Sequence, residues 1–303
     1  MSEHPVDILY RRRGAGEFGY ALFSIFGSAA GFALGIAIAI AEQDLAVFYI
    51  ALFAVTLLFT GVGVSLGLHR LFSHHSFVPT RALKITLAIA GVSTGQGYFF
   101  RWVNDHHLHH RHSDQPGDPH SPYFVGTKPI SGLTGFIHSH CGWLLTKRVP
   151  FNTSNFKRIA NDQDLTWIDR NSITITILSI LLPGLLSLFY EASGSGFVKG
   201  CIWGGFARIF VLNHITWSVN SFGHLLGHDP FPNKKDHAKN NALLGLLAFG
   251  DGWHANHHAV PVSARHGNGH RQFDFNYMLL LVFAKLGWVK DIKVPKPKDV
   301  AIR

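Results

Sequence analysis

The stretch that decides the fold runs from residue 45 to residue 74 and reads LAVFYIALFAVTLLFTGVGVSLGLHRLFSH. Residues 45–68 carry no charged side chain. At a rise of 1.5 Å per residue, about 20 apolar residues cross the ~30 Å hydrocarbon core of a bilayer. The stretch then ends in HRLFSH, which places His69 and His74 where the chain leaves the membrane. Because imidazole is a common metal ligand, the sequence predicts a membrane span that leads into a metal site.

Three more apolar stretches are long enough to span a bilayer, at residues 18–40, 172–189 and 197–219. Short connections at residues 41–44 and 190–196 join the four spans in pairs, so each pair is a hairpin that returns the chain to its starting side. The chain is 47% hydrophobic and 15% charged, whereas about a quarter of the residues of a soluble domain are charged. We therefore expect an all-α integral membrane protein with four transmembrane helices in two hairpins.

The distribution of basic residues predicts the orientation. Neither short connection contains any of the 27 Lys and Arg residues, and only Lys199 and Arg208 fall inside a span. The other 25 (27 minus 2) lie on one common side, which the positive-inside rule makes cytoplasmic, together with both termini. The net charge of +9 then reflects the anionic cytoplasmic leaflet, and we do not expect nucleic-acid binding.

A fifth apolar stretch, residues 81–100, is ambiguous because it includes Lys84 and Gln96. If it crossed the membrane, the histidines before it and after it would lie on opposite sides. Metal–nitrogen bonds are only about 2 Å long, so such histidines could not share a metal centre. We expect this stretch to be a buried or interfacial helix. It belongs to a helical cytosolic cap, built from residues 71–170 and 220–303, within one domain that comprises residues 1–303.

Histidines gather in four short motifs, HRLFSH, DHHLHH, NSFGH and WHANHH. They supply nine candidate metal ligands: His69, His74, His106, His109, His110, His224, His254, His257 and His258. Two motifs have the spacing i, i+3, i+4, which puts three imidazoles on one helix face and suits two neighbouring metals better than one. His69 and His74 would lie about 140° apart on a regular α-helix, so they converge only if that helix bends or ends.

The residues alone do not name the metal, but they exclude some classes of site. No motif contains the glutamate of a zinc-protease H-E-x-x-H motif, and Cys141 and Cys201 cannot form a cysteine-rich zinc or iron–sulfur site. Asp105, Asp114, Asp118 and Asp251 are close enough in sequence to accept hydrogen bonds from ligand histidines. The other histidines are expected at the surface or in the core: His4, His75, His107, His112, His120, His138, His140, His214, His228, His237, His266 and His270.

In their order and spacing, HRLFSH, WVNDHHLHH, TWSVNSFGH and GDGWHANHH resemble the histidine motifs of membrane-bound fatty acyl desaturases of the stearoyl-CoA (delta-9) type. GFIHSHCGWLL and SARHG are similar to the bacterial and plastid-type branch. The resemblance implies two iron ions, with O2 as the co-substrate. One iron would be bound by His69, His74, His106, His110 and His257. The other would be bound by His109, His224, His254 and His258, with Asn220 reaching an iron through water.

The resemblance also implies an acyl-binding tunnel. Thr216 and Trp217 match residues at its bend, and Trp102 and Asp105 match positions near its mouth. Lys147 and Arg148 match a basic pair near the phosphates of the acyl carrier.

The sequence departs from that pattern where acyl-CoA members have a basic residue, because it has Asn104 there. Residues 268–272 also lack the tryptophan pair that is typical of the branch. The carrier therefore stays open between CoA, lipid and acyl carrier protein. No HPGG-type haem motif of a fused cytochrome b5 is present. We expect electrons from a separate protein of the ferredoxin, rubredoxin or cytochrome b5 type.

The function expected from the residues and the resemblance together is oxygen-dependent introduction of a cis double bond, at the delta-9 position, into a saturated acyl chain. No side chain can remove hydrogen from an unactivated methylene, so the metal centre must carry the chemistry. A hydroxylase with similar histidine motifs is an alternative enzyme. A metal transporter is an alternative of another class, but transporters place their ligands near the bilayer midplane, whereas these motifs lie at span ends.

Overall fold

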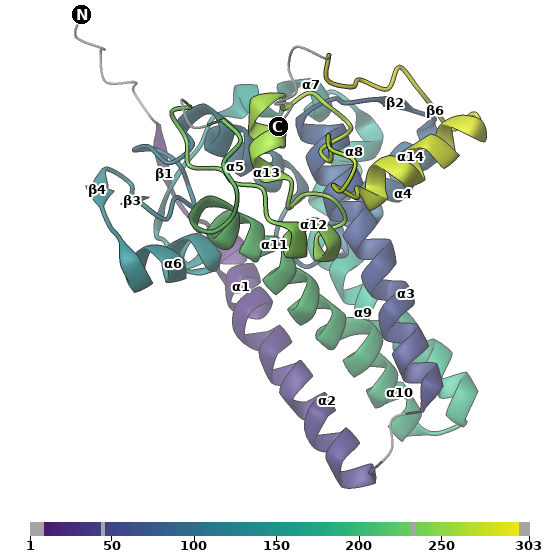
Figure 1. The fold of residues 1–303 in the computed structure, drawn as a ribbon. Coiled ribbons are helices and arrows are strands. Elements are labelled where there is room, and N and C mark those ends of the chain that lie inside the picture. Colours follow the sequence, from purple (N-terminus) through teal and green to yellow (C-terminus); the bar gives the residue numbers. More distant parts are fainter. Residues whose placement is uncertain (1–8, 44–45, 232–233, 297–303) are drawn as a thin grey trace, which may run out of the picture.

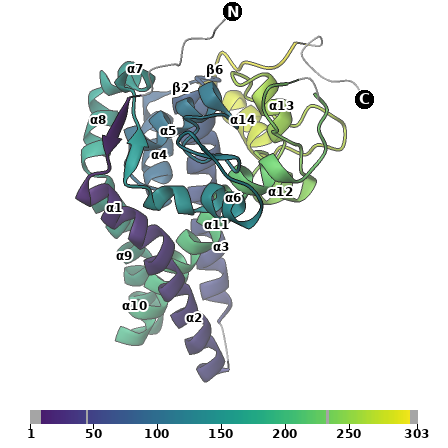
Figure 2. The same cartoon turned by 90° about the vertical axis from the view of Figure 1, so that its left-hand side faces the viewer.

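Four long helices form a stem, and the rest of the chain forms a cap on one end of it (Figures 1 and 2). This computed structural model describes residues 9–43, 46–231 and 234–296. All four helices are long and apolar enough to cross a membrane, as predicted: Ala15–Glu42, Val47–Ser73, Ser172–Glu191 and Gly194–Leu225. Each extends beyond the stretch expected from the sequence at one end or both. Asp44 and Leu45, which were expected to end the first connection and begin the second span, lie outside the described residues.

Three of the four stem helices contain a π-helical segment. The first consists of α1 (Ala15–Leu22), η1 (Phe23–Gly27) and α2 (Ser28–Glu42). The second consists of α3 (Val47–Val62) and η2 (Gly63–Ser73). The third is α9 (Ser172–Glu191), and the fourth consists of α10 (Gly194–Gly200), η5 (Cys201–Ala207) and α11 (Arg208–Leu225).

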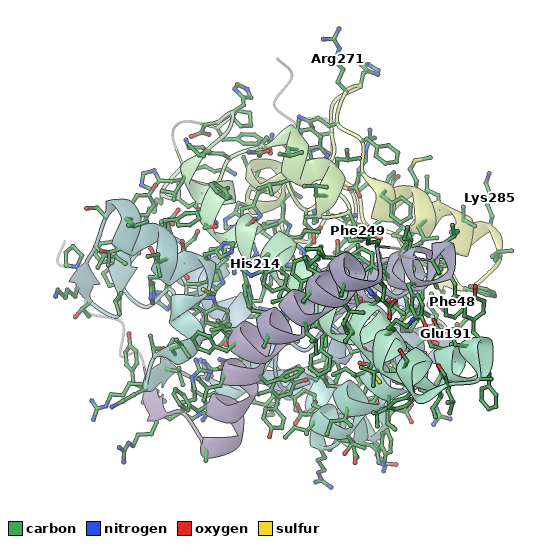
Figure 3. The ribbon with its side chains drawn as sticks, turned by 90° about the horizontal axis from the view of Figure 1, so that it is seen from below. Phe48, Glu191, His214, Phe249, Arg271 and Lys285 are labelled. Atoms are coloured by element: carbon green, nitrogen blue, oxygen red, sulfur yellow. The ribbon has the colours of Figure 1, made fainter. Side chains whose placement is uncertain are left out.

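Polar and aromatic contacts hold the two hairpins together at the end of the stem that is remote from the cap. The Nζ atom of Lys199 lies 2.8 Å from a carboxylate oxygen of Glu191 and 3.3 Å from one of Glu42. The rings of Phe48 and Tyr190 stack with their centroids 4.0 Å apart. Figure 3 shows Phe48 and Glu191 close together in the view along the stem. Lys199, which was expected inside a span, therefore lies at a span end and is paired with two carboxylates.

Small residues let the stem helices approach closely. A Cβ atom added to Gly31 would lie 2.4 Å from Phe206, and one added to Gly35 would lie 2.6 Å from Ile202. Helices in membranes associate largely through this kind of close packing, because lipid provides no hydrophobic force between them. These contacts hold α2 close against η5.

The π-helix η2 brings the two histidines at the end of the second span to one side of the helix. The amide of His74 donates to the carbonyl of His69, five residues earlier, at 3.2 Å. This i→i+5 bond places both histidines on one face. The helix was expected to bend or end at this point. It does end here, because η2 stops at Ser73 with His74 as its C-cap, and its wider π-turn also brings the two histidines together.

The cap consists of short helices, three 3₁₀ or single-turn elements and three two-stranded antiparallel sheets (Figure 2). Its helices are α4 (Arg81–Val92), α5 (Phe99–His112), α6 (Gly132–His140), α8 (Gln163–Arg170), α12 (Ala242–Leu247), α13 (His254–Ala259) and α14 (Phe275–Lys285). The short elements are η3 (Gly142–Leu145), η4 (Thr153–Asn155) and α7 (Lys157–Ala160). The strand pairs are β1 (Tyr10–Arg12) with β5 (Arg148–Pro150), β2 (Val78–Pro79) with β6 (Val289–Lys290), and β3 (Phe124–Val125) with β4 (Lys128–Pro129).

The ambiguous fifth stretch does not span the membrane, as predicted. It forms α4, a turn at residues 93–98 and the start of α5. The α4 helix packs so closely on η2 that a Cβ atom added to Gly63 would lie 2.3 Å from the backbone of Ala90. The carboxylate of Asp169 accepts a hydrogen bond from the amide of Phe100 at 2.8 Å and caps the first turn of α5. The histidines before and after the stretch therefore lie on the same side.

Candidate metal centre

The structure brings the nine candidate histidines together in two groups. Within each group, one ring nitrogen of every member lies within 4.8 Å of those of the others. Group 1 contains His69, His74, His106, His110 and His257. Group 2 contains His109, His224, His254 and His258. These are the two sets that the motif resemblance implied, although they come from four separate segments.

Two short helices build both groups at once. The α5 helix contributes two histidines to group 1 and one, His109, to group 2. The α13 helix contributes two to group 2 and one, His257, to group 1. Side chains at i, i+3 and i+4 share a helix face but fan out across it, so one helix can serve two adjacent sites. The remaining ligands come from η2, its C-terminal cap His74, and α11.

The Nε2 atoms within each group face one another. In group 1, Nε2 of His257 lies 2.9 Å from the Nε2 atoms of both His69 and His110. In group 2, the corresponding distance between His224 and His254 is 2.9 Å. Ring nitrogens at this distance can share a proton as an N–H···N hydrogen bond, and in the tautomer that leaves both lone pairs on Nε2 they can bind a metal ion between them.

Carboxylates fix the opposite side of four of these rings. The Nδ1 atoms lie at hydrogen-bonding distance from an aspartate in the pairs His69–Asp251 (3.1 Å), His109–Asp118 (3.0 Å), His224–Asp114 (2.8 Å) and His258–Asp236 (3.3 Å). An Nδ1–H that donates to a carboxylate leaves the lone pair on Nε2 and makes the ring a stronger metal ligand. Asp114, Asp118 and Asp251 were among the expected partners, and Asp236 was not. Asp105, also expected, does not contact a histidine and pairs with Arg101 at 2.7 Å.

Burial sets the charge state of the centre. It lowers the pKa values of the ring nitrogens well below the usual histidine value, and the neighbouring imidazoles lower them further, in His74, His106, His110, His254, His257 and His258. Burial alone would raise the pKa of Asp118, but His109 keeps it below the ordinary aspartate value. His69 has the same effect on the pKa of Asp251. Neutral imidazoles backed by charged carboxylates are the protonation states that metal binding needs.

The donor set fits two transition-metal ions. Imidazole suits Fe, Zn, Cu and Ni, whereas Mg²⁺ and Ca²⁺ require oxygen ligands. Two nitrogens bound to one ion at about 2.1 Å can be at most about 4.2 Å apart, so the Nε2 pairs at 2.9 Å could share an ion, whereas nitrogens at the 4.8 Å limit of a group would have to move closer. Iron is among the metals that these ligands accommodate, and the nine histidines would hold the ions without help from a carboxylate ligand.

Two histidines that the sequence analysis assigned to surface or core belong to this network. The centroids of the His120 and His109 rings lie 4.3 Å apart, and His120 is buried beside Asp118. The Nδ1 atom of His266 lies 3.2 Å from Asp251. The signals that could have found them were the D-P-H sequence at Asp118 and the position of His266 in SARHG. By contrast, His214 contacts His140 at 2.9 Å, away from both groups.

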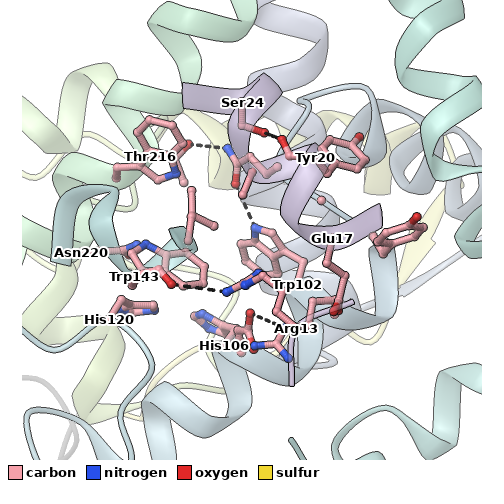
Figure 4. Close-up of a pocket in the computed structure, with 18 residues that line it drawn as sticks. Arg13, Glu17, Tyr20, Ser24, Trp102, His106, His120, Trp143, Thr216 and Asn220 are labelled. Atoms are coloured by element: carbon pink, nitrogen blue, oxygen red, sulfur yellow. Dashed lines mark hydrogen bonds and ion pairs between the residues drawn. The ribbon is translucent and has the colours of Figure 1, made fainter. Parts of the chain in front are cut away.

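Two cavities meet at the metal centre, and their common walls are Trp102, His106, Thr216 and Asn220. The first cavity also touches α1 and reaches Arg13, Glu17, Arg101 and Asp105 near the cap surface (Figure 4). The second runs along η2 and α11 and is lined by apolar residues that include Val64, Leu212, Ile215, Val219 and Phe249. Together the cavities give an elongated space with a polar end, the histidines at its middle and an apolar end.

A chain of hydrogen bonds crosses this space at its middle. The indole N–H of Trp102 donates to Oε1 of Gln96 at 2.9 Å, and Nε2 of Gln96 donates to the hydroxyl of Thr216 at 3.1 Å (Figure 4). The Trp102 ring also stacks on His106, with centroids 5.2 Å apart. The structure therefore places Trp102 beside Thr216, between the two cavities, and Asp105 at the polar end. Gln96 was not among the expected site residues.

The remaining expected substrate residues lie in different places. Trp217 is buried and lines the first cavity. Lys147 and Arg148 line a separate surface hollow with Tyr10 and Thr127. The basic pair is therefore near the cap surface but not on the wall of the cavity that reaches the histidines.

Asp118→Asn is expected to lower the metal affinity of group 2 by about 10–100-fold, the usual effect of losing a carboxylate behind a ligand histidine. The new amide would also direct N–H groups at the amides of Asp114 and His120, which donate to the Asp118 carboxylate. Competition with a chelator, followed by metal analysis, measures the loss. Asp291→Asn makes the same change at an exposed position and should retain its metal. Equal metal retention in both variants would contradict a role for Asp118.

Comparison with known proteins was made with the whole chain. The profile of the family described as "Fatty acid desaturase" matches residues 43–273. A hex-5-enoyl-(acyl-carrier protein) acetylenase of Moorena producens is 37% identical over 241 residues, which cover 79% of this chain and 75% of the relative. An sn-1 stearoyl-lipid 9-desaturase of a Synechocystis strain is 35% identical over 246 residues, 80% of this chain and 70% of the relative. Acyl-CoA desaturase 1 of Saccharomyces cerevisiae is 29% identical over 237 residues, which cover 77% of this chain and 44% of the relative.

Proposed function

The chain belongs to the fatty acid desaturase family, and from this membership we propose that it is an oxygen-dependent di-iron enzyme that introduces a cis double bond into a saturated acyl chain. We propose delta-9 as the position of the bond, which is the position named for the stearoyl-lipid 9-desaturases it is similar to. The observation that carries the proposal is the convergence of nine histidines, six of them buried, in two groups beside two adjoining cavities.

Each part of the site has a task in this reaction. Bound iron would supply the oxygen activation that removal of hydrogen from an unactivated methylene requires. The histidines of the two groups would hold the ions, and the four aspartates would keep those rings oriented. The apolar cavity would exclude water. The Trp102–Gln96–Thr216 chain would hold the acyl chain bent beside the histidines, and Asn220, which lines both cavities, is placed to reach an ion through water.

We also propose that the cap and both termini are cytoplasmic. The α9–α10 connection, at Ala192 and Ser193, contains no basic residue, which supports this orientation under the positive-inside rule. Electrons would come from a separate protein of the ferredoxin, rubredoxin or cytochrome b5 type. His69 and His224 lie at the cap ends of two stem helices, and the other candidate ligands lie outside the stem helices, which favours an enzyme over a metal transporter with ligands along a transmembrane path.

The test is product analysis with deuterium-labelled stearoyl chains carried on CoA, on a glycerolipid and on acyl carrier protein, with a reductant and air. We expect a product that has lost two hydrogens and has a cis double bond at carbon 9. A product that has gained one oxygen would identify a hydroxylase and reject the proposal. A hexenoyl substrate added in parallel shows whether the chain resembles its acetylenase relative in activity.

Thr216→Leu is expected to change the distribution of product chain lengths and double-bond positions. The larger side chain would narrow the space at the expected bend of the acyl chain, and loss of the hydroxyl would remove the group that accepts the hydrogen bond from Gln96. Thr216→Ser keeps the hydroxyl and should retain the original distribution, although with less wall contact. Gas chromatography of products from a mixture of acyl chains of different lengths measures both. If Thr216→Leu and the unmodified chain give the same product profile, Thr216 is not part of the acyl-binding wall.

A further inference from the structure

An apolar groove opens on the membrane-facing side of the stem between α1 and α9. Its walls are almost entirely apolar and include Gly16, Gly19 and Phe23 on one side and Ile173, Ile177 and Ile180 on the other. Ile173 is 44% exposed and Ile177 is 50% exposed, so both present bare aliphatic surface in the part of the stem that lipid would surround. The groove therefore has the chemistry of a site for hydrocarbon.

The groove and the first cavity adjoin at Tyr20. Gly16 and Gly19 face the groove, Ala21 and Ser24 face the cavity, and Tyr20 lines both. The buried Tyr20 ring lies between these two faces of α1, and its hydroxyl is hydrogen-bonded to the hydroxyl of Thr176 across the groove. A route between the groove and the cavity would have to pass this ring.

A polar hollow lies at the cap end of the groove, where a lipid headgroup would be. It shares Gly16 with the groove and shares Glu17 and Arg101 with the cavity. Arg11 also lines the hollow and donates to Glu17 at 2.8 Å. The guanidinium of Arg11 lies 4.4 Å from the centre of the Phe151 ring. Charged groups of both signs beside aromatic rings suit the polar part of a glycerolipid.

The basic residues expected near the phosphates of CoA lie off the walls of both cavities. Lys147 and Arg148 line another hollow. Asn104, which stands where a basic residue is expected in acyl-CoA enzymes, is fully buried. Its Oδ1 accepts from the amide of Asn152 at 2.9 Å and its Nδ2 donates to Asp105 at 3.0 Å. Asn104 therefore fastens the residue 150–155 segment to α5 and has no free group for a phosphate.

We propose that the substrate is the acyl chain of a membrane glycerolipid, which enters sideways from the bilayer through the α1–α9 groove and passes Tyr20 to reach the histidines. This inference rests on the proposed desaturase function and names its carrier. The headgroup remains in the polar hollow at the membrane surface while the hydrocarbon chain occupies the groove and the cavity. Because the chain never leaves an apolar environment, entry needs no transfer of hydrocarbon through water.

The test places a bulky side chain in the groove, once from α1 and once from α9. A Cβ atom added to Gly19 meets nothing within 4 Å, so Gly19→Phe should fit without distorting α1. Ile177→Trp fills the same space from α9. Ala30→Phe and Leu178→Trp place the same bulk at exposed stem positions outside the groove and are the matched controls. Each variant is reconstituted in vesicles of labelled 1-stearoyl-2-oleoyl phosphatidylglycerol and the matching monogalactosyl lipid, with stearoyl-CoA supplied separately from water.

Both groove variants should convert vesicle lipid about tenfold more slowly, the factor expected when burial of roughly two methylene groups is lost, and the controls should not. Equal conversion by groove and control variants would overturn the lateral route. Conversion of stearoyl-CoA alone by the unmodified chain would also overturn it, while leaving the desaturase function intact. If the unmodified chain converts neither substrate, the lateral route fails, and stearoyl-acyl carrier protein supplied in its place then decides whether the desaturase function stands.

Discussion

Replacing His257 with alanine is expected to abolish product formation, with a loss of roughly 10³-fold or more, as for removal of a central catalytic group. His257 is fully buried, and its Nε2 faces those of both His69 and His110. Its removal therefore breaks group 1 at the point where three segments of the chain meet. Product yield and metal content of the purified protein, measured on the same sample, check the expectation.

The control for this variant is His112→Ala, which removes an imidazole from the same histidine-rich segment as His106 without touching either group. It should keep both its metal and its activity. Both variants should still insert into the membrane, because neither position lies in a span. Continued desaturation by His257→Ala at the unmodified rate would refute its role as a ligand.

Replacing Arg70 with alanine is expected to lower the free energy of unfolding by about 3–5 kcal/mol, the usual result of removing one partner of a buried ion pair. The Arg70 side chain is completely buried, and it pairs with Asp251 at 3.0 Å and with Asp274 at 2.9 Å. It also donates to the carbonyl of Ala264 at 2.7 Å. Without Arg70, two buried carboxylates would lose their counter-charge, and one of them orients His69.

Denaturant unfolding of the detergent-solubilised protein measures this effect. Arg81→Ala is the control, because Arg81 also pairs with an aspartate, Asp164, but its side chain is 77% exposed. Exposed ion pairs contribute little to stability, so Arg81→Ala should unfold nearly as the unmodified chain does. If the two variants unfold at the same denaturant concentration, the buried network around Arg70 does not support the fold in the way described.

Local patterns in the sequence were enough to predict the membrane part of the fold. The four uncharged or nearly uncharged runs and the short acidic connections identify the stem, because the bilayer imposes a strict length and composition on a span. The argument from metal–ligand distance correctly placed the 81–100 stretch in the cap. What could not be predicted is the π-helical turn at residues 63–73, because helical periodicity at 3.6 residues per turn was assumed for the whole span.

The histidines and their partners differ in how well sequence could predict them. The motif resemblance implied the same two sets of histidines that the structure brings together. Asp236 lies in a loop, 22 residues before His258, and only the fold brings it beside that ring. Gln96 was missed for the same reason: a residue that acts through a hydrogen bond across the fold carries no local spacing signal. Asn104 was noticed as a departure, but its role in fastening residues 150–155 required the structure.

The central claim is that the nine histidines form a centre for two iron ions. Metal analysis of the protein, purified after expression in iron-supplemented medium and washed free of loosely bound ions, tests it most directly. The account predicts about two tightly held iron ions per chain in the unmodified protein and fewer in His257→Ala. Zinc in place of iron, one ion per chain, or metal that washes out as readily from the unmodified protein as from His257→Ala would contradict the account.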